Sequence, residues 1–196
     1  MTRIFPASVF VILLCLPGPA LRAAEADGFT GMPAVLPSGM VMVQGHDLTL
    51  WGIAELASDQ QCWHENRAWD CGEQSLIALR HYLAGHPVRC AIKSYPDNGP
   101  MSAQCFRKSG NKEEDIAQYL VAQGWARDAA DESDNLYAKD EDSARQSRRG
   151  IWTSRFQRAK DWKNGISRYV EYEAAPPRVH AMSAMHMVPA SDDDAR

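Results

Sequence analysis

The sequence predicts a mixed α+β fold, mainly β, and three observations lead to this prediction. Its 196 residues suit a single domain, and a composition of 45% hydrophobic and 23% charged residues is typical of a globular protein. Several short segments that are apolar or alternate between apolar and polar residues are bounded by turn residues, as in β-hairpins. Other segments place apolar residues at the spacing of amphipathic helices.

The first expected elements are a hairpin and a helix. Residues 40–44 and 48–53 are apolar or alternating and flank the turn residues Gly45-His46-Asp47, which predicts an early hairpin. Residues 73–84 then carry apolar side chains at helical spacing, and Gly85 is expected to end this helix. Its expected inner face contains Leu76, Ile77, Leu79, Tyr82 and Leu83.

A second hairpin is expected around the turn signature Pro96-Asp97-Asn98-Gly99, with strands at residues 88–94 and 101–108. Two further helices should follow. Glu113, Glu114 and Asp115 suit the N-terminal end of one that finishes at Gly124, because carboxylates stabilise that end of a helix. The other is expected from about residue 134 to 149, with Leu136, Tyr137 and Ala144 facing inward.

The N-terminal segment is typical of a cleaved secretory signal. A basic start precedes a short apolar run and small residues, which predicts cleavage after Ala26, with Ala23 as the alternative. The expected organisation is a signal peptide at 1–26, a linker at 27–32, a folded domain at 33–168 and a disordered tail at 169–196. The protein is therefore expected to be periplasmic or secreted, with no membrane span.

Export favours disulfides among the cysteines that remain after signal cleavage. These are Cys62, Cys71, Cys90 and Cys105, for which three pairings exist. Cys90 and Cys105 lie at similar offsets from the turn of the second hairpin, which favours pairing them and leaves Cys62 with Cys71. Zinc binding with nearby histidines is the rival interpretation, but the spacing lacks the paired knuckles of structural zinc sites.

Several motifs occur together in an order that resembles the thermonuclease-like (staphylococcal-nuclease-like) family, in its exported bacterial branch with two disulfides. They include Leu50-Trp51-Gly52-Ile53, Gln60-x-Cys62, Trp69-x-Cys71-Gly72, Gly124-Trp125-Ala126 and Gly150-Ile151-Trp152. The resemblance extends from about residue 35 to 162. It implies a five-stranded OB-type barrel that carries about three helices.

In active members of this family, carboxylates bind calcium, a glutamate activates water and two arginines stabilise the charge on the phosphate during phosphodiester cleavage. None of these groups is expected here. Gly39 and Ala54 stand at the calcium aspartates, Ala57 at the glutamate, and Thr49 and Pro100 at the arginines. The resemblance therefore implies the fold without the catalytic residues, and no cofactor is expected.

Charge is unevenly distributed within a chain whose formal net charge is −4. Ten acidic residues between Glu113 and Asp142 precede eight basic residues between Arg145 and Arg168. Cations near aromatic rings suit weak binding of single-stranded nucleic acid or another anionic polymer. The alternative is that the aromatics pack in the interior. The candidate anion-binding residues are Arg145, Arg148, Arg149, Trp152, Arg155 and Arg158.

The tail contains a second pattern, with thioethers and imidazoles crowded together. Such groups suit copper(I), although methionine and histidine in a disordered tail are commonly incidental. The candidate ligands are Met182, Met185, His186 and Met187.

The leading functional hypothesis is thus an exported thermonuclease-like protein that is catalytically inactive and acts as a binding or structural module. A calcium-dependent nuclease with a relocated site, using a carboxylate such as Glu55, Asp59 or Asp97, is the first alternative. Copper binding by the tail is the second. On a strand, Glu55 should point to the face opposite Ala54, which counts against Glu55 as a replacement calcium ligand.

Overall fold

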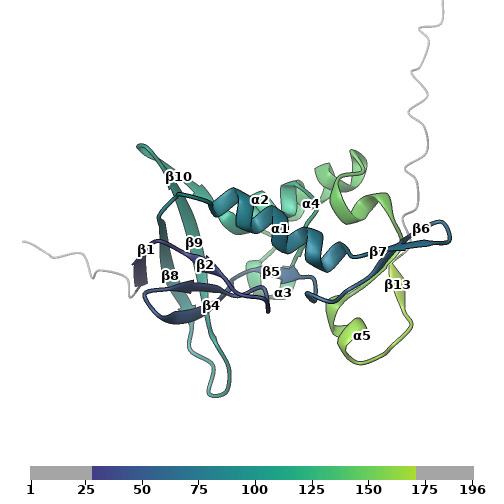
Figure 1. Ribbon diagram of the computed structural model, residues 1–196, viewed down its shortest axis with the longest axis horizontal. Coiled ribbons are helices and arrows are strands. Elements are labelled where there is room, and N and C mark those ends of the chain that lie inside the picture. The colour runs from purple at the N-terminus through teal and green to yellow at the C-terminus, as the bar shows by residue number, and fades with distance from the viewer. Residues whose placement is uncertain (1–27, 171–196) are drawn as a thin grey trace, which may run out of the picture.

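The computed structural model describes residues 28–170, in which a β-barrel lies beside a smaller lobe (Figure 1). The fold is α+β and mainly β, as predicted. Its main sheet has seven strands in the order β1-β8-β9-β4-β3-β2, with β10 paired to β9. The strands are β1 (Gly28–Gly31), β2 (Ala34–Val35), β3 (Val41–Val43), β4 (His46–Leu50), β8 (Val88–Ser94), β9 (Met101–Ser109) and β10 (Lys112–Asp115).

This sheet closes on itself, because the strands at its two ends are consecutive in the chain. β1 pairs with β8 and β2 pairs with β3, although only Met32 and Pro33 separate β1 from β2. Beside this junction, the Gln44 side chain donates a hydrogen bond to the Thr30 carbonyl oxygen, at 2.9 Å. If β1 and β2 are counted as one bent strand, β1/β2, β3, β4, β8 and β9 form a five-stranded barrel, compatible with the expected OB type.

Both predicted hairpins are present. The β3–β4 turn places Gln44 and Gly45 at φ 54° and 82°, the left-handed conformation that two-residue hairpin turns require. In the β8–β9 hairpin, Cys90 lies directly opposite Cys105 and the two form a disulfide. A second disulfide joins Cys62 and Cys71, so the predicted pairing is confirmed.

The first predicted helix is confirmed as α1 (Cys71–Leu83), whereas the later ones differ from expectation. Glu113 and Glu114 belong to β10, and only Asp115 caps α2 (Ile116–Ala122), by accepting hydrogen bonds from two backbone N–H groups. The predicted helix at 134–149 is wrong at its start. Asp134 and Asn135 adopt left-handed φ values of 53° and 61°, which separate α3 (Ala130–Ser133) from α4 (Ala138–Gln146).

This break also changes which side chains face inward. Leu136 lies in the turn between α3 and α4 and is 53% exposed, contrary to the prediction. Tyr137 and Ala144 are buried, as predicted. The Tyr137 hydroxyl donates a hydrogen bond to Asp115 Oδ2 at 3.0 Å, which links the start of α4 to the cap of α2.

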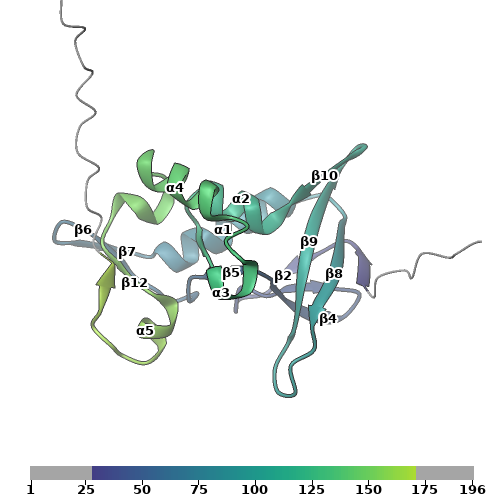
Figure 2. The same cartoon turned by 180° about the vertical axis from the view of Figure 1, so that it is seen from behind.

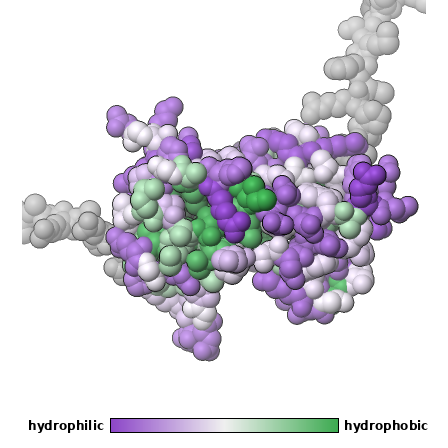
Figure 3. Space-filling model, in the orientation of Figure 1, coloured by the Kyte–Doolittle hydropathy of each residue, from purple (hydrophilic) through white to green (hydrophobic). Residues whose placement is uncertain are grey.

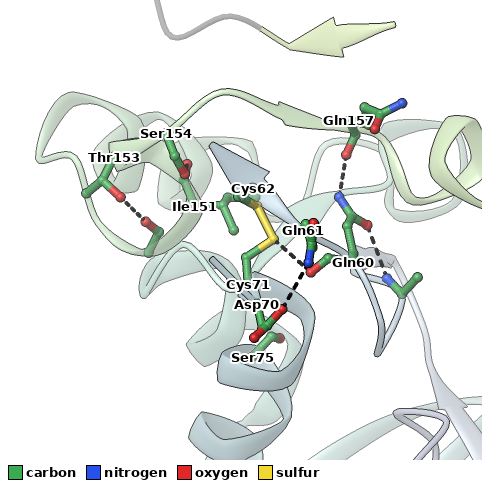
Figure 4. Close-up of a disulfide and its surroundings, with 12 residues drawn as sticks. Gln60, Gln61, Cys62, Asp70, Cys71, Ser75, Ile151, Thr153, Ser154 and Gln157 are labelled. Carbon is green, nitrogen blue, oxygen red and sulfur yellow. Dashed lines mark hydrogen bonds between the residues drawn. A yellow bond between two sulfur atoms is a disulfide. The ribbon is translucent and has the colours of Figure 1, made fainter. Parts of the chain in front are cut away.

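The smaller lobe has a hydrophobic core of its own, built around the Cys62–Cys71 disulfide (Figure 4). Trp152 and Phe156 pack there edge to face, with ring centroids 5.2 Å apart. The lobe contains β6 (Cys62–His64), β7 (Arg67–Trp69), the 3₁₀ helix at Gly150–Thr153, β12 (Phe156–Gln157), α5 (Ala159–Lys163) and β13 (Tyr169–Val170).

The described fold extends beyond the expected domain bounds of 33–168 at both ends. Residues 28–31, expected within a linker, form β1 and pair with β8. Tyr169 and Val170, expected in the tail, form β13 and pair with β12. Main-chain pairing with a neighbouring strand therefore includes both segments in the fold.

Among the described residues, no helix is long and apolar enough to cross a membrane. The predicted signal peptide lies outside the described residues.

Candidate functional site

A cleft of about 380 Å³ opens between the barrel and the smaller lobe. On the barrel side, it is bounded by Ser38 before β3, by β4 and β5 (Ile53–Glu55), and by the loop that joins β8 to β9. Three charged residues line the cleft: Glu55 on β5, Glu132 on α3 and Lys163 on α5. Figure 2 shows that the β8–β9 loop and α5 project on the same side of the molecule.

The five positions that the family resemblance assigns to catalysis do not all meet at this cleft. Thr49 and Pro100 line it. Gly39 lies beside it, because a Cβ built on Gly39 would be 3.9 Å from Glu55 Oε2. Ala54 is exposed and pairs with Arg127 of β11 (Ala126–Asp128), and Ala57 is buried.

Sequence reasoning placed Glu55 opposite Ala54 but did not place it at the cleft. The alternation of faces along β5 is as expected, since Ala54 and Glu55 point in opposite directions. However, the face that carries Glu55 is the one that lines the cleft. The carboxyl group of Glu55 therefore lies beside Gly39, in the region where the resemblance places a calcium aspartate.

Burial dominates the electrostatics of Glu55. It raises the pKa of this carboxyl group from its ordinary value of 4.5 to about 7, because a charged carboxylate is poorly solvated there. The Lys163 ammonium acts in the opposite direction and lowers the pKa. With a pKa of about 7, the carboxyl group can carry a proton near neutral pH, and in that form it can donate as well as accept a hydrogen bond.

Sequence reasoning also missed Glu132, Ser102 and Lys163. The Ser102 hydroxyl donates a hydrogen bond to Glu132 Oε1 at 3.2 Å, which joins β9 to α3 across the cleft wall. These residues belong to segments far apart in the chain, and no local motif marks them. Lys163 is part of the basic segment that the sequence analysis identified, but nothing in that pattern directs its side chain to a cleft.

A buried glutamine holds the segment that carries Lys163. Gln60 is fully buried, and its amide donates a hydrogen bond to the Gln157 carbonyl oxygen at 2.7 Å and accepts one from the Ala57 N–H at 3.2 Å (Figure 4). Trp162 Nε1 donates a further hydrogen bond to Asp59 Oδ1 at 3.1 Å. These contacts attach β12 and α5 to the chain that follows β5, and they place Lys163 at the cleft.

The donor set of the cleft does not fit the calcium ion that the family resemblance implies. Calcium takes six to eight oxygen ligands, several of them carboxylates. Glu55 and Glu132 are the carboxylates that line this cleft, and the Lys163 ammonium shares it with them. Within residues 28–170, no group of three or more histidine, cysteine, aspartate or glutamate side chains is arranged to hold a metal ion.

Trp152, the aromatic residue among the candidate anion-binding residues, is not accessible for stacking. Trp152 is only 2% exposed, so its ring is unavailable to a base, and the Arg145 guanidinium lies 4.8 Å from its centroid. Arg145 also donates to Glu141 Oε1 at 3.0 Å, and Arg149 donates to Ser143 Oγ at 2.7 Å.

The other three candidate cations, Arg148, Arg155 and Arg158, are exposed. At least two of them interact with other residues of the chain. Arg155 lies over the Tyr169 ring, with its guanidinium carbon 4.7 Å from the centroid. Arg148 also has a partner within the chain, and Arg158 is exposed immediately before α5. The candidate copper ligands Met182, Met185, His186 and Met187 lie outside the described residues.

This chain shows limited similarity to known proteins in both sequence and structure. No family model matches the chain. A relative, the "Succinoglycan biosynthesis protein ExoI" of Rhizobium meliloti (strain 1021), is 27% identical over 139 residues, which are 70% of this chain and 71% of that protein. Among solved structures, the extended Tudor domain of Drosophila melanogaster Tudor-SN (p100) is 12% identical with a TM-score of 0.42, over 68% of this chain and 78% of that one.

Proposed function

We propose that this protein is an exported, thermonuclease-like binding module that does not cleave phosphodiester bonds with calcium. The observation that carries the proposal is the content of the cleft. Gly39, Thr49 and Pro100 stand where the resemblance requires a carboxylate and two guanidinium groups, and a glutamate and a lysine from elsewhere in the chain share the space.

The magnitude of the missing interactions supports inactivity. Removal of a single preorganised charge-stabilising contact costs about 10² to 10³ in rate, and here both arginines are absent together with the calcium ligands. Neither Thr49 nor Pro100 carries a charge to replace them. The alanine at position 57 removes the group that would activate water.

Export is proposed from the N-terminal pattern together with the disulfides. Cys62–Cys71 and Cys90–Cys105 are consistent with an oxidising compartment outside the cytoplasm. The name of the relative in Rhizobium meliloti connects that protein with synthesis of a polysaccharide. A role in binding at the cell envelope, rather than in nucleic acid degradation, agrees with both features.

The test is a nuclease assay on the mature chain, starting at residue 27. Single-stranded DNA is incubated with the protein and calcium, with and without chelator, beside a calcium-dependent nuclease as positive control. We expect no hydrolysis above a protein-free blank under any condition. Hydrolysis that requires calcium and disappears with chelator would contradict the proposal.

The raised pKa of Glu55 favours a second candidate function, a hydrolase in which Glu55 donates or accepts a proton. Among the carboxylates Glu55, Asp59 and Asp97, we favour Glu55 for this role, because Asp59 accepts a hydrogen bond from Trp162 and Asp97 does not line the cleft. If any hydrolysis is detected, this candidate requires that Glu55→Gln abolish it while Asp97→Asn leaves it unchanged. Equal activity of all three proteins would eliminate Glu55 as the catalytic group.

Weak binding of anionic polymers by the basic segment stays a prediction. Arg155 and Arg158 are the strongest candidates for this binding, because both side chains are exposed. The Trp152 ring is buried and is not available to a ligand. Binding of single-stranded DNA at two salt concentrations tests it, with Arg155→Gln and Arg158→Gln combined. Binding that neither weakens with salt nor changes in the double variant would rule out this segment.

A further inference from the structure

We propose that the cleft between the barrel and α5 is a subsite for a neutral, hydroxyl-rich glycan segment. This inference rests on the proposed binding function and names its ligand class. It depends on three properties of the cleft, namely its charge, its hydrogen-bonding groups and its position on the barrel.

Charge argues against a polyanion in this cleft. A phosphate or uronate would face the carboxyl groups of Glu55 and Glu132, with Lys163 as the one cation among the described lining residues. Desolvating an anion beside a carboxylate is costly, and one partly compensated ammonium does not offset it. A divalent cation is disfavoured as well, because the Lys163 ammonium shares the cleft with the two carboxyl groups and would repel it.

The same groups suit hydroxyls, which donate and accept hydrogen bonds. Ser38, Thr49 and Asn98 provide uncharged polar side chains along the cleft, and Glu55 near its pKa offers both a donor and an acceptor. Thr49 Oγ1 uses its proton on the Met101 carbonyl oxygen, at 3.3 Å, which leaves its lone pairs for a ligand. Pro96 and Pro100 add apolar ring faces that can cover the C–H face of a sugar.

Position on the barrel gives the third argument. The cleft meets the loop before β3 and the loop between β8 and β9, which join successive strands of the closed sheet. In OB-type barrels, loops at these places and the adjoining strands form a surface for oligonucleotides and oligosaccharides. Its volume of about 380 Å³ lies in the range of small-ligand sites. Because two carboxyl groups line the cleft, charge favours a neutral oligosaccharide over an oligonucleotide.

Figure 3 shows that apolar residues gather on the barrel side of the face in view, whereas hydrophilic residues dominate the part of the molecule that carries α5. Sugars suit a site that offers both apolar and polar contacts, because their rings have an apolar face and polar edges.

The test is a two-dimensional NMR titration of the labelled mature chain with cellotetraose and maltotetraose as neutral probes. Tetragalacturonate, a short oligothymidylate and spermidine are the charged comparisons. We expect a neutral probe at about 10 mM or below to shift backbone amide signals at residues 49–56 and 96–102. The charged probes should leave these signals in place.

Variants connect the shifts to named side chains. Glu55→Leu removes both hydrogen-bonding oxygens and should weaken neutral glycan binding about tenfold or more. Asn98→Ala, in the exposed loop between β8 and β9, should weaken it severalfold. The matched control, Glu65→Gln, changes an exposed glutamate in the β6–β7 turn and should bind as the wild type does.

Three results would overturn the inference: no shift at the cleft with either neutral probe, tighter binding of a charged probe there, or unchanged affinity in both Glu55→Leu and Asn98→Ala. None of these results bears on the nuclease assay. A chain without glycan binding and without nuclease activity leaves the proposed inactive module in place, whereas calcium-dependent cleavage overturns that function whatever the glycan titration shows.

Discussion

Replacing Glu55 with glutamine should change how stability depends on pH. The free energy of unfolding of the variant, minus that of the wild type, should be higher at alkaline pH than at acidic pH. The wild-type carboxyl group has a pKa of about 7 in the folded protein, against an ordinary value of 4.5. It therefore binds a proton more tightly in the folded state than in the unfolded chain. Its contribution to stability is fully present below 4.5 and is lost as pH rises through about 7.

The size of the effect follows from that difference. Each unit of pKa difference corresponds to about 1.4 kcal/mol, so ionisation at high pH costs the folded wild type about 3 kcal/mol in total. Between about pH 5 and pH 8, the change is about 2 to 3 kcal/mol, because the unfolded chain is already largely ionised at the lower value. Glutamine has similar volume and no titration, so the variant lacks this dependence.

The assay is urea unfolding of wild type and Glu55→Gln at both pH values, followed by fluorescence. Effects of other titrating groups are shared by the two proteins and cancel in the difference between them. Glu65→Gln in the exposed β6–β7 turn controls for loss of one negative charge. A stability difference between wild type and Glu55→Gln that is the same at both pH values would refute the raised pKa of Glu55. Lys163→Met should raise the pKa of Glu55 further, because it removes the ammonium that lowers it, and the carboxyl ¹³C shift measures this directly.

Other predictions concern close approaches, a disulfide and a buried hydrogen bond that stabilise the fold. Gly124→Ala should cost about 3 kcal/mol or more, because its Cβ would lie 2.2 Å from the Arg149 carbonyl oxygen, whereas Gly85→Ala, at nearly the same positive φ but in open space, should cost about 1 kcal/mol. Equal losses in urea unfolding would contradict the close approach of these two chain segments. Replacing both Cys62 and Cys71 by serine should cost about 3 kcal/mol under non-reducing conditions, as expected for a short closed loop, and an unchanged unfolding midpoint would refute this. Gln60→Ala should cost about 2 to 4 kcal/mol, since it leaves the buried Gln157 carbonyl and Ala57 N–H groups unpaired. It should also increase protease cleavage near α5, and resistance equal to wild type would show that Gln60 does not attach this segment.

Local chemistry explains what could be predicted from the sequence. Turn residues predicted both hairpins, and equal offsets from Pro96-Asp97-Asn98-Gly99 predicted the Cys90–Cys105 pair, because strand register follows from turn position. Helical spacing predicted α1. These features depend on residues close in sequence, so a single chain is enough to infer them.

Features that depend on distant segments could not be inferred in the same way. The split between α3 and α4 follows from left-handed backbone at Asp134 and Asn135, which a helical pattern does not reveal. Glu132 and Lys163 reach the cleft from α3 and α5 through tertiary packing. For Glu55, the alternation of strand faces was predicted correctly, but which face lines the cleft is set by how β5 pairs with β11.

The relation between Glu55 and Gly39 gives the change at this cleft a physical meaning beyond loss of catalytic groups. A Cβ at position 39 would lie 3.9 Å from Glu55 Oε2, so an aspartate there would bring a second carboxylate against the first. Two negative charges about 4 Å apart repel each other by about 4 kcal/mol near a protein surface. Without a metal, Gly39→Asp should therefore raise the pKa of Glu55 above its present value. It should not by itself create a calcium site, because one added carboxylate does not supply the six or more oxygen ligands that calcium takes. Glycine at position 39 and glutamate at position 55 are thus mutually compatible in this cleft, and the chain holds a protonatable carboxyl group beside the position where the resemblance places a metal ligand.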